Sequence, residues 1–495
     1  MTRHDSARPR RVDRSGWLAA AQAALDAGGR LVALWGADRR PQEGLAACAA
    51  YLVKGELVWA DLDLGADETY PGLSRFFPHA VRMERAAYDL VGVQAEGGAD
   101  GRPWLDHDAW SRRFPLRTDA VAAAGAALDY PFVRVEGEGV HEIAVGPVHA
   151  GIIEPGHFRF SVVGEKVLRL EQRLGYTHKG IEKRFTELEP LEAHRLAGRV
   201  SGDCTVAYAW AYCTALEAAA GVHTPPRAAW LRALALERER VANHLGDLGA
   251  LGNDAALAVG LAHFSRLREL WQRRSRELFG HRFMMDYAVP GGVGGDLDAA
   301  QLAAVALDCA ALEREVRELR TLYDEHAGLQ DRFVTTGRVT PALAQQLGLT
   351  GLAARASGQA IDLRVERAGA PYAELGVRLA RQKNGDVAAR VNVRFDEVLE
   401  SLRLIREICA RAPGGPVRAT CAVPAAGAGI GAVEGWRGEV LVALELAGGR
   451  LRRCHAHDPS WQNWPALEHA VIGNIVPDFP LINKSFNLSY SGHDL

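Results

Sequence analysis

The pattern of apolar and polar residues divides the first part of the chain into short helices and strands. Residues 17–25 are rich in Ala and Leu at helical spacing, whereas residues 30–35 and 56–64 have the composition of strands. A stretch rich in Gly and Asp, residues 95–108, follows them, and residues 118–130 have the pattern of a linker helix. These features predict a small α/β unit.

The next part of the chain begins with strands and continues with helices. Residues 133–145 and 157–171 alternate between apolar and polar positions, and Gly164-Glu165 interrupts the second segment as a hairpin turn would. Between residues 180 and 280 the spacing becomes helical. One apolar stripe shows this spacing: Leu231, Leu234, Val241, Leu245 and Leu248. A helix bundle is therefore expected here.

A glycine-rich segment at residues 290–295 ends the expected bundle. Further helices are predicted at residues 297–323 and 392–411, and strands near residues 438–446. The Ala- and Gly-rich tract at residues 425–432 is predicted to be a loop.

The predicted fold class is α+β, with an N-terminal α/β domain followed by a mainly helical domain that has a flanking β-sheet. The boundaries expected from the pattern are residues 16–130 for the first domain and 131–495 for the second, with a disordered terminus at residues 1–15. With 495 residues, of which 48% are apolar, the chain can bury more than one core.

Charge and cysteine usage exclude several classes of protein. The 58 basic residues nearly balance 61 acidic ones, which argues against nucleic-acid binding. The seven cysteines form no C-x-x-C pair, a pattern that fits a reducing cytoplasm and offers no zinc or cluster site. No signal sequence and no charge-free run of about 18 residues is present, so any link to a membrane is expected to pass through partners.

Several motifs resemble one known family. Residues 83–92, M-E-R-A-A-Y-D-L-V-G, are similar to the signature of the small hydrophilic subunit of complex I. Residues 146–149, 154–157 and 175–183 are similar to the opening of the adjoining large subunit. Further motifs follow in the family's order: R-V-S-G-D-C at 199–204, the helix at 237–245, R-F at 282–283, P-G-G-V at 290–293, G-D-V at 385–387, A-V-E at 432–434, R-G-E at 437–439 and D-P-S at 458–460.

Together the motifs resemble a fusion of this small subunit with the large subunit that complex I shares with energy-converting nickel-iron hydrogenases. The resemblance covers nearly the whole chain after Ser15. It implies a position on the inner face of the cell membrane and three kinds of partner: an iron-sulfur small subunit, a ferredoxin-like subunit and antiporter-like membrane subunits. It also implies that the iron-sulfur clusters belong to those partners and that this chain itself binds no cofactor.

The chain departs from the hydrogenase pattern at the positions that hold nickel. Such hydrogenases use four thiolates, two in R-x-C-G-x-C and two in D-P-C-x-x-C, whereas this chain has Ser201, Cys204, Ser460 and Asn463 there. A serine hydroxyl has too high a pKa to replace a bridging thiolate, and a neutral amide is a weak ligand for a soft metal site. The sequence therefore predicts a degenerate site without nickel.

The residues that contact quinone in complex I are changed as well. The family pattern has a His and a Tyr where this chain has Ile153 and Gly202, although His149, Arg199 and Tyr208 remain close in register. Tyr208 stands where hydrogenases carry a histidine. Quinone binding is left open by these residues.

Two carboxylates remain as candidates for proton transfer. Glu154 occupies the position that resembles the proton-gating carboxylate of hydrogenases, and apolar neighbours would raise its pKa toward neutrality. The alternative is a surface ion pair with Arg159 or Lys166. His178 and Glu182 are spaced for one helix face, where they would form either a relay or a solvated structural network.

Three other groups of residues have more ordinary interpretations. Arg240, Asn243 and His244 allow either a functional or a structural role, and Cys204 alone is more typical of a small buried residue. The local set from Cys454 to Asp458 lacks a second half for a zinc site. Residues 427–432 fit G-x-G-x-x-A, but no acidic partner follows at the distance that a dinucleotide site requires.

Two functional hypotheses follow from these observations. The first is the large subunit of a membrane-associated oxidoreductase complex that couples electrons from an iron-sulfur partner to proton or ion movement. The second is a non-catalytic scaffold that assembles a membrane ion-transport complex. The sequence does not name the electron donor or acceptor, nor the ion.

Overall fold

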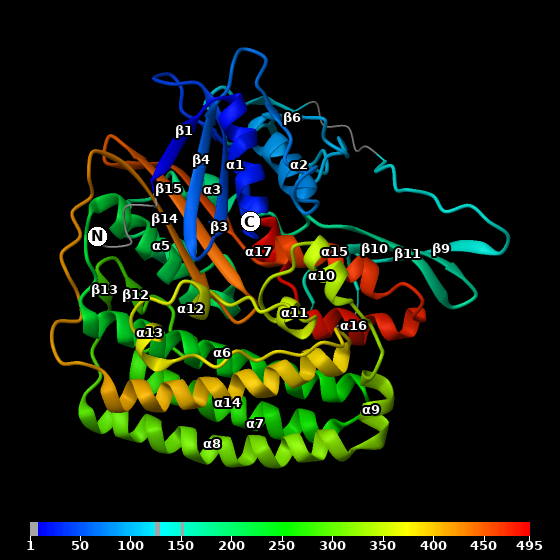
Figure 1. The fold of residues 1–495 in the computed structure, drawn as a ribbon, viewed down its shortest axis with the longest axis vertical. Coiled ribbons are helices and arrows are strands. Elements are labelled where there is room, and N and C mark those ends of the chain that lie inside the picture. Colours follow the sequence, from blue (N-terminus) through cyan, green and yellow to red (C-terminus); the bar gives the residue numbers. More distant parts are fainter. Residues whose placement is uncertain (1–7, 124–128, 150–152) are drawn as a thin grey trace.

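The computed structural model describes residues 8–123, 129–149 and 153–495, and it has the predicted α+β fold (Figure 1). The N-terminal unit is built on a four-stranded sheet with the order β1-β4-β3-β2, in which only the β1–β4 pair is parallel. Its strands are β1 (Pro9–Val12), β2 (Arg30–Asp38), β3 (Leu45–Val53) and β4 (Glu56–Asp63). Its helices are α1 (Arg14–Asp26) and α2 (Ala80–Val91).

The N-terminal segment is more ordered than its polar composition predicts. Residues 9–12 were expected to be disordered but form β1. Helix α1 begins at Arg14 because the Asp13 side chain accepts a hydrogen bond from the Gly16 amide at 2.7 Å and caps the helix. The remainder of the expected disordered segment, residues 1–7, lies outside the described residues.

Strand β3 was not predicted, because both of its faces are buried and its sequence does not alternate. Ala47, Ala49 and Tyr51 belong to the main core, which also contains residues of α1 and α2. The intervening residues Ala46 and Cys48 belong to a second apolar core. A strand that is covered on both sides has apolar residues at successive positions, so its period is hidden.

The second core joins the N-terminal sheet to a sheet in the large domain. That sheet has the order β14-β15-β16 and consists of β14 (Ala426–Glu434), β15 (Glu439–Ala447) and β16 (Arg450–His457). The seam between the sheets contains Val32, Trp35, Cys48, Ile430, Leu441 and Ala443. At 2.7 Å each, ion pairs from Arg39 to Glu445 and from Arg30 to Glu439 also cross it.

The predicted loop at residues 425–432 is wrong, because this tract forms most of β14. The strand lies directly on α5 (Thr205–Ala220), as Figure 1 shows. A Cβ atom at Gly429 would lie 2.1 Å from the Ala215 carbonyl oxygen, and one at Gly431 would lie 2.2 Å from that of Ala211. The small residues therefore permit close strand–helix packing and do not mark a turn.

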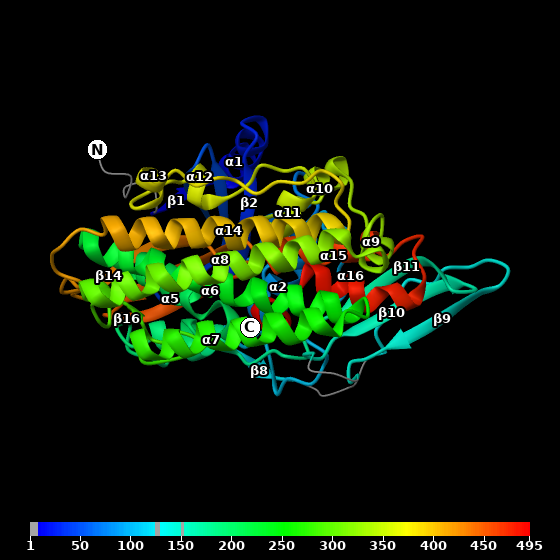
Figure 2. The same cartoon turned by 90° about the horizontal axis from the view of Figure 1, so that it is seen from below.

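The expected helix bundle is formed by four long helices (Figures 1 and 2). They are α6 (Pro226–Asp254), α7 (Ala258–Phe279), α8 (Ala299–Glu325) and α14 (Val387–Arg411). Helix α6 packs against both α7 and α14, and α8 packs on α14. The central position of α6 explains why charged residues such as Glu237 and Arg240 are buried on it.

A three-stranded arm extends from the molecule (Figure 2). It consists of β9 (Val140–Val145), β10 (His157–Val163) and β11 (Lys166–Arg173), in the order β11-β10-β9. The predicted hairpin at Gly164-Glu165 joins β10 to β11. Residues 133–139, expected to be part of a strand, are not in one.

The linker helix expected at residues 118–130 is not found in its described part. Residues 118–123 contain only the short strand β8 (Val121–Ala122), which pairs with β7 (Arg112–Arg113). Residues 124–128 lie outside the described residues. The placement of the domain boundary at residue 130 stays a prediction.

The remaining elements are short and mostly connect the sheets to the bundle. They are β5 (Thr69–Pro71), β6 (Gln94–Glu96), α3 (Ile181–Phe185), α4 (His194–Ala197), η2 (Gly202–Cys204), β12 (Ala288–Val289), β13 (Gly292–Val293), α9 (Ala327–Phe333), α10 (Pro341–Gln346), α11 (Gly351–Ala356), α12 (Leu363–Glu366), α13 (Tyr372–Leu375), α15 (Ser460–Ala470), η3 (Val476–Asp478), α16 (Phe479–Phe486) and α17 (Tyr490–Asp494). None of the helices in the described part of the chain has the length and apolar character needed to span a membrane.

Candidate functional site

The degenerate nickel positions of the two motifs lie close together despite their separation in the chain. Ser201 precedes η2 at the start of α5, and Ser460 is the first residue of α15. Ser489 joins them: its hydroxyl lies 3.1 Å from the Ser201 hydroxyl, and its amide donates to the Ser460 hydroxyl at 2.9 Å. All three side chains are buried.

Asp458 positions the second motif against helix α5. Its carboxylate accepts hydrogen bonds from the Ser460 amide and from the Tyr208 hydroxyl, both at 2.8 Å. Gly492 lies so close that a Cβ atom there would be 2.4 Å from the Asp458 carboxylate. Burial, with Asp458 beside it, raises the pKa of Tyr208 well above its ordinary value. The Tyr208 hydroxyl therefore stays protonated and donates a hydrogen bond to Asp458.

An arginine occupies the region beside the one remaining thiol. Arg437 lies between β14 and β15 and forms an ion pair with Asp203, and its Nη1 lies 3.4 Å from Cys204 Sγ. Burial and the Asp203 carboxylate raise the pKa of Cys204 well above that of an ordinary thiol. Although burial opposes it, Arg437 lowers the pKa of Asp203. The thiol is thus neutral and the carboxylate charged.

The donor atoms at these positions do not fit a nickel-iron pair. The Asn463 amide is already used, because its Oδ1 accepts from the Thr350 amide at 3.1 Å and its Nδ2 donates to the Thr350 carbonyl at 3.2 Å. Two hydroxyls and one amide replace three of the four thiolates that such a centre requires, and only Cys204 could supply one. The guanidinium of Arg437 next to the sulfur also opposes a cation there.

A buried glutamate holds the start of α5 next to this site. The carboxylate of Glu239 accepts hydrogen bonds from the amides of Val206 and Ala207 at 2.7 and 3.3 Å. Burial raises the pKa of Glu239 to about 8. At neutral pH this side chain is therefore largely protonated in the folded chain.

The prediction that apolar neighbours surround Glu154 is wrong, because this side chain is exposed. Its carboxylate accepts a hydrogen bond from the Ser491 amide at 3.1 Å, and this places it against the C-terminal segment that also carries Ser489. The alternative partner, Arg159, pairs instead with Glu142 at 2.9 Å. A role for Glu154 in proton transfer stays a prediction.

His178 and Glu182 do not share a helix face. Gly180, with φ 66°, caps α3, which begins only at Ile181. The His178 ring donates to the Asp494 carbonyl at 2.7 Å and packs on Trp110, with the ring centroids 4.7 Å apart. Glu182 instead contacts the large-domain sheet, so the two side chains form no direct relay.

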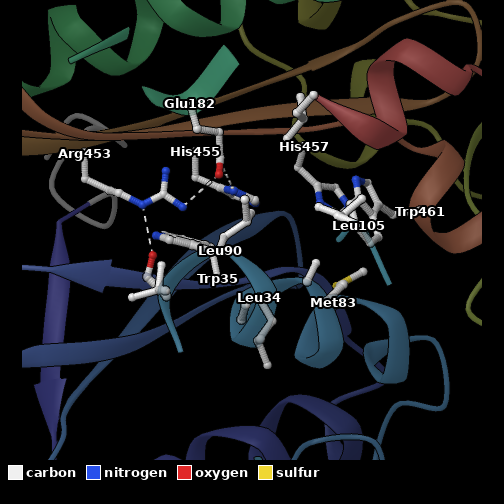
Figure 3. A pocket seen from close by; sticks show the side chains of 15 residues that line it. Leu34, Trp35, Met83, Leu90, Leu105, Glu182, Arg453, His455, His457 and Trp461 are labelled. Carbon is white, nitrogen blue, oxygen red and sulfur yellow. Dashed lines mark hydrogen bonds and ion pairs between the residues drawn. The ribbon is translucent and has the colours of Figure 1, made fainter. Parts of the chain in front are cut away.

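Glu182 belongs to a buried group at the seam between the two sheets (Figure 3). Its carboxylate pairs with His455 at 2.6 Å and with Arg453 at 3.1 Å. Although burial opposes it, Arg453 and His455 lower the pKa of Glu182 to about 2. The His455 ring stacks on Trp35 at 4.8 Å, beside an apolar cavity of about 20 Å³. This arrangement locks the N-terminal unit onto β16.

The local set considered for zinc is occupied by other contacts. His457 Nε2 lies 3.0 Å from the Gln462 side-chain oxygen, while His455 is bonded to Glu182 and Asp458 to Tyr208. Within the described residues, no group of three or more metal-binding side chains is arranged around a common point.

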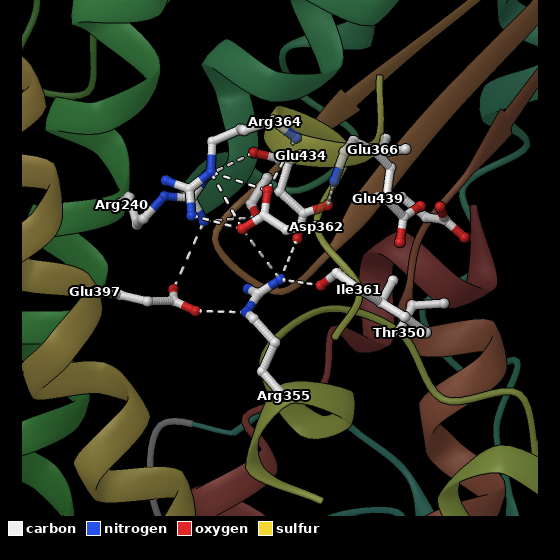
Figure 4. A network of polar contacts seen from close by, with 12 residues as sticks. Arg240, Thr350, Arg355, Ile361, Asp362, Arg364, Glu366, Glu397, Glu434 and Glu439 are labelled. Carbon is white, nitrogen blue, oxygen red and sulfur yellow. Dashed lines mark hydrogen bonds and ion pairs between the residues drawn. The ribbon is translucent and has the colours of Figure 1, made fainter. Parts of the chain in front are cut away.

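Arg240 lies in a buried ionic network between α6, α12, α14 and β14 (Figure 4). His244 joins this network through Glu397. Arg355 is central, with its guanidinium 2.7 Å from both Glu397 and Glu434. His244 lies 2.7 Å from Glu397. Asn243 instead donates to the Asp203 carbonyl at 2.7 Å and supports the degenerate nickel site.

The other predicted site residues lie away from this centre. Arg199 is exposed and pairs with Asp286 at 2.6 Å. His149 is half-buried in the connection between β9 and β10, and Ile153 is exposed. The structure therefore brings Ser201, Cys204, Ser460 and Tyr208 together, whereas Asn463 bonds to Thr350. It does not place Arg199, His149 or Glu182 with them.

Sequence reasoning missed several residues that form the site. Asp203 and Arg437 lie inside motifs that had been recognised, so their opposite charges could have indicated a pair. Ser489 lies in no recognised motif, and only the tertiary structure shows that it joins Ser201 to Ser460.

Comparisons with known proteins match both halves of the chain. Residues 10–125 match the family model of the 30 kDa subunit of respiratory-chain NADH dehydrogenase. Residues 254–426 match that of the 49 kDa subunit. A structure of the membrane-bound sulfane sulfur reductase, an archaeal respiratory membrane complex, contains a chain with a TM-score of 0.68, 24% identity and coverage of 72% of this chain and 99% of that one. This last likeness concerns the fold.

Among curated relatives, formate hydrogenlyase subunit 5 of Escherichia coli K12 is 32% identical over 94% of this chain and 85% of its own length. The carbon monoxide-induced hydrogenase of Rhodospirillum rubrum is 34% identical over 70% of this chain and 97% of its length. An NADH-quinone oxidoreductase subunit of Bacteroides thetaiotaomicron is 29% identical over 77% of this chain and 76% of its length. The chain therefore belongs to the family of large subunits shared by membrane-bound hydrogenases and NADH-quinone oxidoreductases, and it joins the 30 kDa and 49 kDa regions in one polypeptide.

Proposed function

We propose that this chain is the large subunit of a membrane-bound oxidoreductase complex that couples electron transfer from an iron-sulfur partner to proton or ion movement without nickel. One observation carries the proposal: Ser201, Cys204 and Ser460 still lie close together, but these side chains and that of Asn463 bond to neighbouring protein groups. The scaffold around the reaction centre is thus retained while the metal-binding chemistry is lost.

The names of the relatives support the kind of complex and its partners. Hydrogenases, a formate hydrogenlyase and NADH-quinone oxidoreductases are among them. By this analogy the partners are an iron-sulfur small subunit, a ferredoxin-like subunit and antiporter-like membrane subunits. The chain would then sit peripherally on the inner face of the membrane, held by those partners.

The side chains at the site suit proton handling better than metal binding. Tyr208 and Asp458 form a buried donor–acceptor pair. At the surface, Glu154 accepts from the amide of Ser491, and the next residue, Gly492, lies against the Asp458 carboxylate. A carboxylate that can titrate at the surface is suited to pass protons toward a buried group. Quinone is the electron acceptor to test first, because the family includes quinone-reducing complexes.

A scaffold without redox activity is the second candidate. The ion pair between Arg437 and Asp203 beside Cys204 favours it, because this pair fills the region next to the former metal positions. The two functions differ in one measurement: electron transfer by the purified membrane complex to quinone, ferredoxin or nicotinamide acceptors. Absence of turnover with all three classes would favour the scaffold.

Nickel analysis tests the loss of the metal site directly. We expect less than about one tenth of a nickel per chain in the complex isolated from its membrane, and no hydrogen evolution with a reduced viologen, because only one of the four positions, Cys204, carries a thiol. Elemental analysis of a nickel-containing hydrogenase relative, purified in parallel, is the control. One nickel per chain would contradict the proposal.

Replacing Glu154 by Gln tests its part in proton movement. Glutamine keeps the oxygen that accepts from the Ser491 amide but cannot titrate, so folding and assembly should be unchanged while redox-linked ion uptake falls severalfold. Ion uptake is measured in inside-out membrane vesicles with the amount of assembled complex held constant. Glu165→Gln, at the exposed β10–β11 turn, is the matched control, and equal uptake by both variants would remove Glu154 from the proton path.

A further inference from the structure

A pocket of about 200 Å³ lies at the junction between the N-terminal unit and the large domain. Helix α2 and the segment after β6 form one side, and β11 and α15 form the other. Four arginines line it, Arg82, Arg85, Arg102 and Arg169, together with the aromatic rings of Trp104 and Tyr130. Its position and its charge are distinct from those of the site described above.

The lining has an excess of positive charge. The four guanidiniums face only three carboxylates, those of Asp100, Glu171 and Glu468. Arg173 lies outside this lining, with the Asp89 carboxylate near it, and stacks on Tyr130 at 3.8 Å while donating to the carbonyls of Pro103 and Asp106. An uncompensated cation in a partly buried site attracts an anion.

Three of the lining side chains retain hydrogen-bonding capacity. Arg82 is 8% exposed and donates through Nη2 to Glu468 at 2.8 Å, yet its buried Nη1 has no hydrogen-bond partner in the described structure. Arg169 has its nearest carboxylate, Glu171, at 3.9 Å. Tyr130 accepts a hydrogen bond from Arg85 at 2.7 Å, so its own hydroxyl hydrogen remains to be donated.

Arg102 lines the same pocket and has hydrogen-bond partners on both sides of its guanidinium. Its guanidinium bonds to Asp100 at 2.6 Å and to Glu171 at 2.7 Å, and it also donates to the Pro131 carbonyl. Arg82 and Arg169 differ from Arg102 in that each keeps a buried donor atom without a hydrogen-bond partner in the described structure, Nη1 of Arg82 and Nε of Arg169. A buried donor without a partner costs free energy unless a ligand satisfies it.

We propose that this pocket binds a small tetrahedral oxyanion of the phosphate class, held by Arg82, Arg169 and Tyr130. Guanidinium groups match the geometry of phosphate oxygens and bind them in a bidentate manner. The volume is below that of a typical pocket for a drug-sized ligand but admits a tetrahedral anion with some water. Because its donors come from α2, from the segment before β9 and from β11, the anion would tie the two domains together.

The site is tested by adding inorganic phosphate to the purified complex that contains the full-length chain. We expect saturable binding by calorimetry at constant ionic strength, weakened about tenfold or more in Arg169→Gln and Tyr130→Phe. Both changes spare the fold, because the Arg169 side chain is 43% exposed and phenylalanine keeps the ring of Tyr130. Arg195→Gln, at a side chain 59% exposed on α4, is the matched control and should bind phosphate like the unaltered chain.

Four outcomes would overturn the proposal. They are the absence of saturable binding, equal affinity in the two pocket variants and the control, acetate binding as tightly as phosphate, and binding by the free chain that disappears in the assembled complex. The last result would mean that a carboxylate of a neighbouring protein in the complex occupies the pocket in place of a free oxyanion.

Discussion

Replacing Arg355 by Met is expected to lower the free energy of unfolding by about 3–5 kcal/mol. Arg355 is fully buried and lies 2.7 Å from both Glu397 and Glu434, and it is 3.5 Å from Asp362. Methionine fills part of the space but leaves these carboxylates without their shared cation. Chemical denaturation followed by circular dichroism measures the loss.

The matched control is Arg317→Met on helix α8. Arg317 is 60% exposed and pairs with Glu313 one turn away, so its removal should cost less than about 1 kcal/mol. If Arg355→Met destabilises the chain no more than this control does, the buried network contributes little to folding. The arginine would then have been retained for another reason.

Replacing Glu239 by Gln is expected to weaken the pH dependence of stability. Burial raises the pKa of Glu239 to about 8 in the folded chain, whereas the unfolded chain has an ordinary glutamate. The contribution of this group to stability is fully present below the unfolded pKa and is lost as the pH rises through about 8. The unaltered chain should therefore lose several kcal/mol more than the variant between about pH 5 and pH 9.

Free energies of unfolding measured across this pH range give the comparison. Glutamine keeps one acceptor oxygen for the 2.7 Å hydrogen bond from the Val206 amide and loses only the longer bond from the Ala207 amide, which uses the other carboxylate oxygen. The start of α5 should therefore be largely preserved. Glu318→Gln, at an exposed position of α8, serves as the control. Parallel stability curves for the unaltered chain and the Glu239 variant would show that this carboxyl titrates normally.

The sequence predicted the family and the convergence of its motifs because ordered motifs carry tertiary information. Ser201 and Ser460 are far apart in the chain, yet both contact Ser489, as expected if the two halves of a former metal site remain folded together. The periodicity of α8 was also visible, because this helix exposes one face, whereas α6 is buried on nearly all sides.

What the sequence did not predict depends on contacts between distant elements. Strand β3 lost its alternation because it is covered on both faces, and β14 looked like a loop because its glycines allow close approach to α5. The spacing of His178 and Glu182 indicated one helix face only if both lay in the helix, and Gly180 caps α3 after His178. The local sequence pattern does not predict an element whose conformation is set by packing against distant parts of the chain.

The apolar seam between the two sheets bears on how the two domains cohere. Val32, Trp35 and Leu441 lie in one shared core, and the ion pairs of Arg30 with Glu439 and Arg39 with Glu445 cross it. Cohesion thus resides in the seam, and the covalent connection after residue 123 adds mainly a high effective concentration of each domain for the other. If that connection were cleaved, the two fragments would stay associated like the subunits of an obligate heterodimer. They would also unfold together.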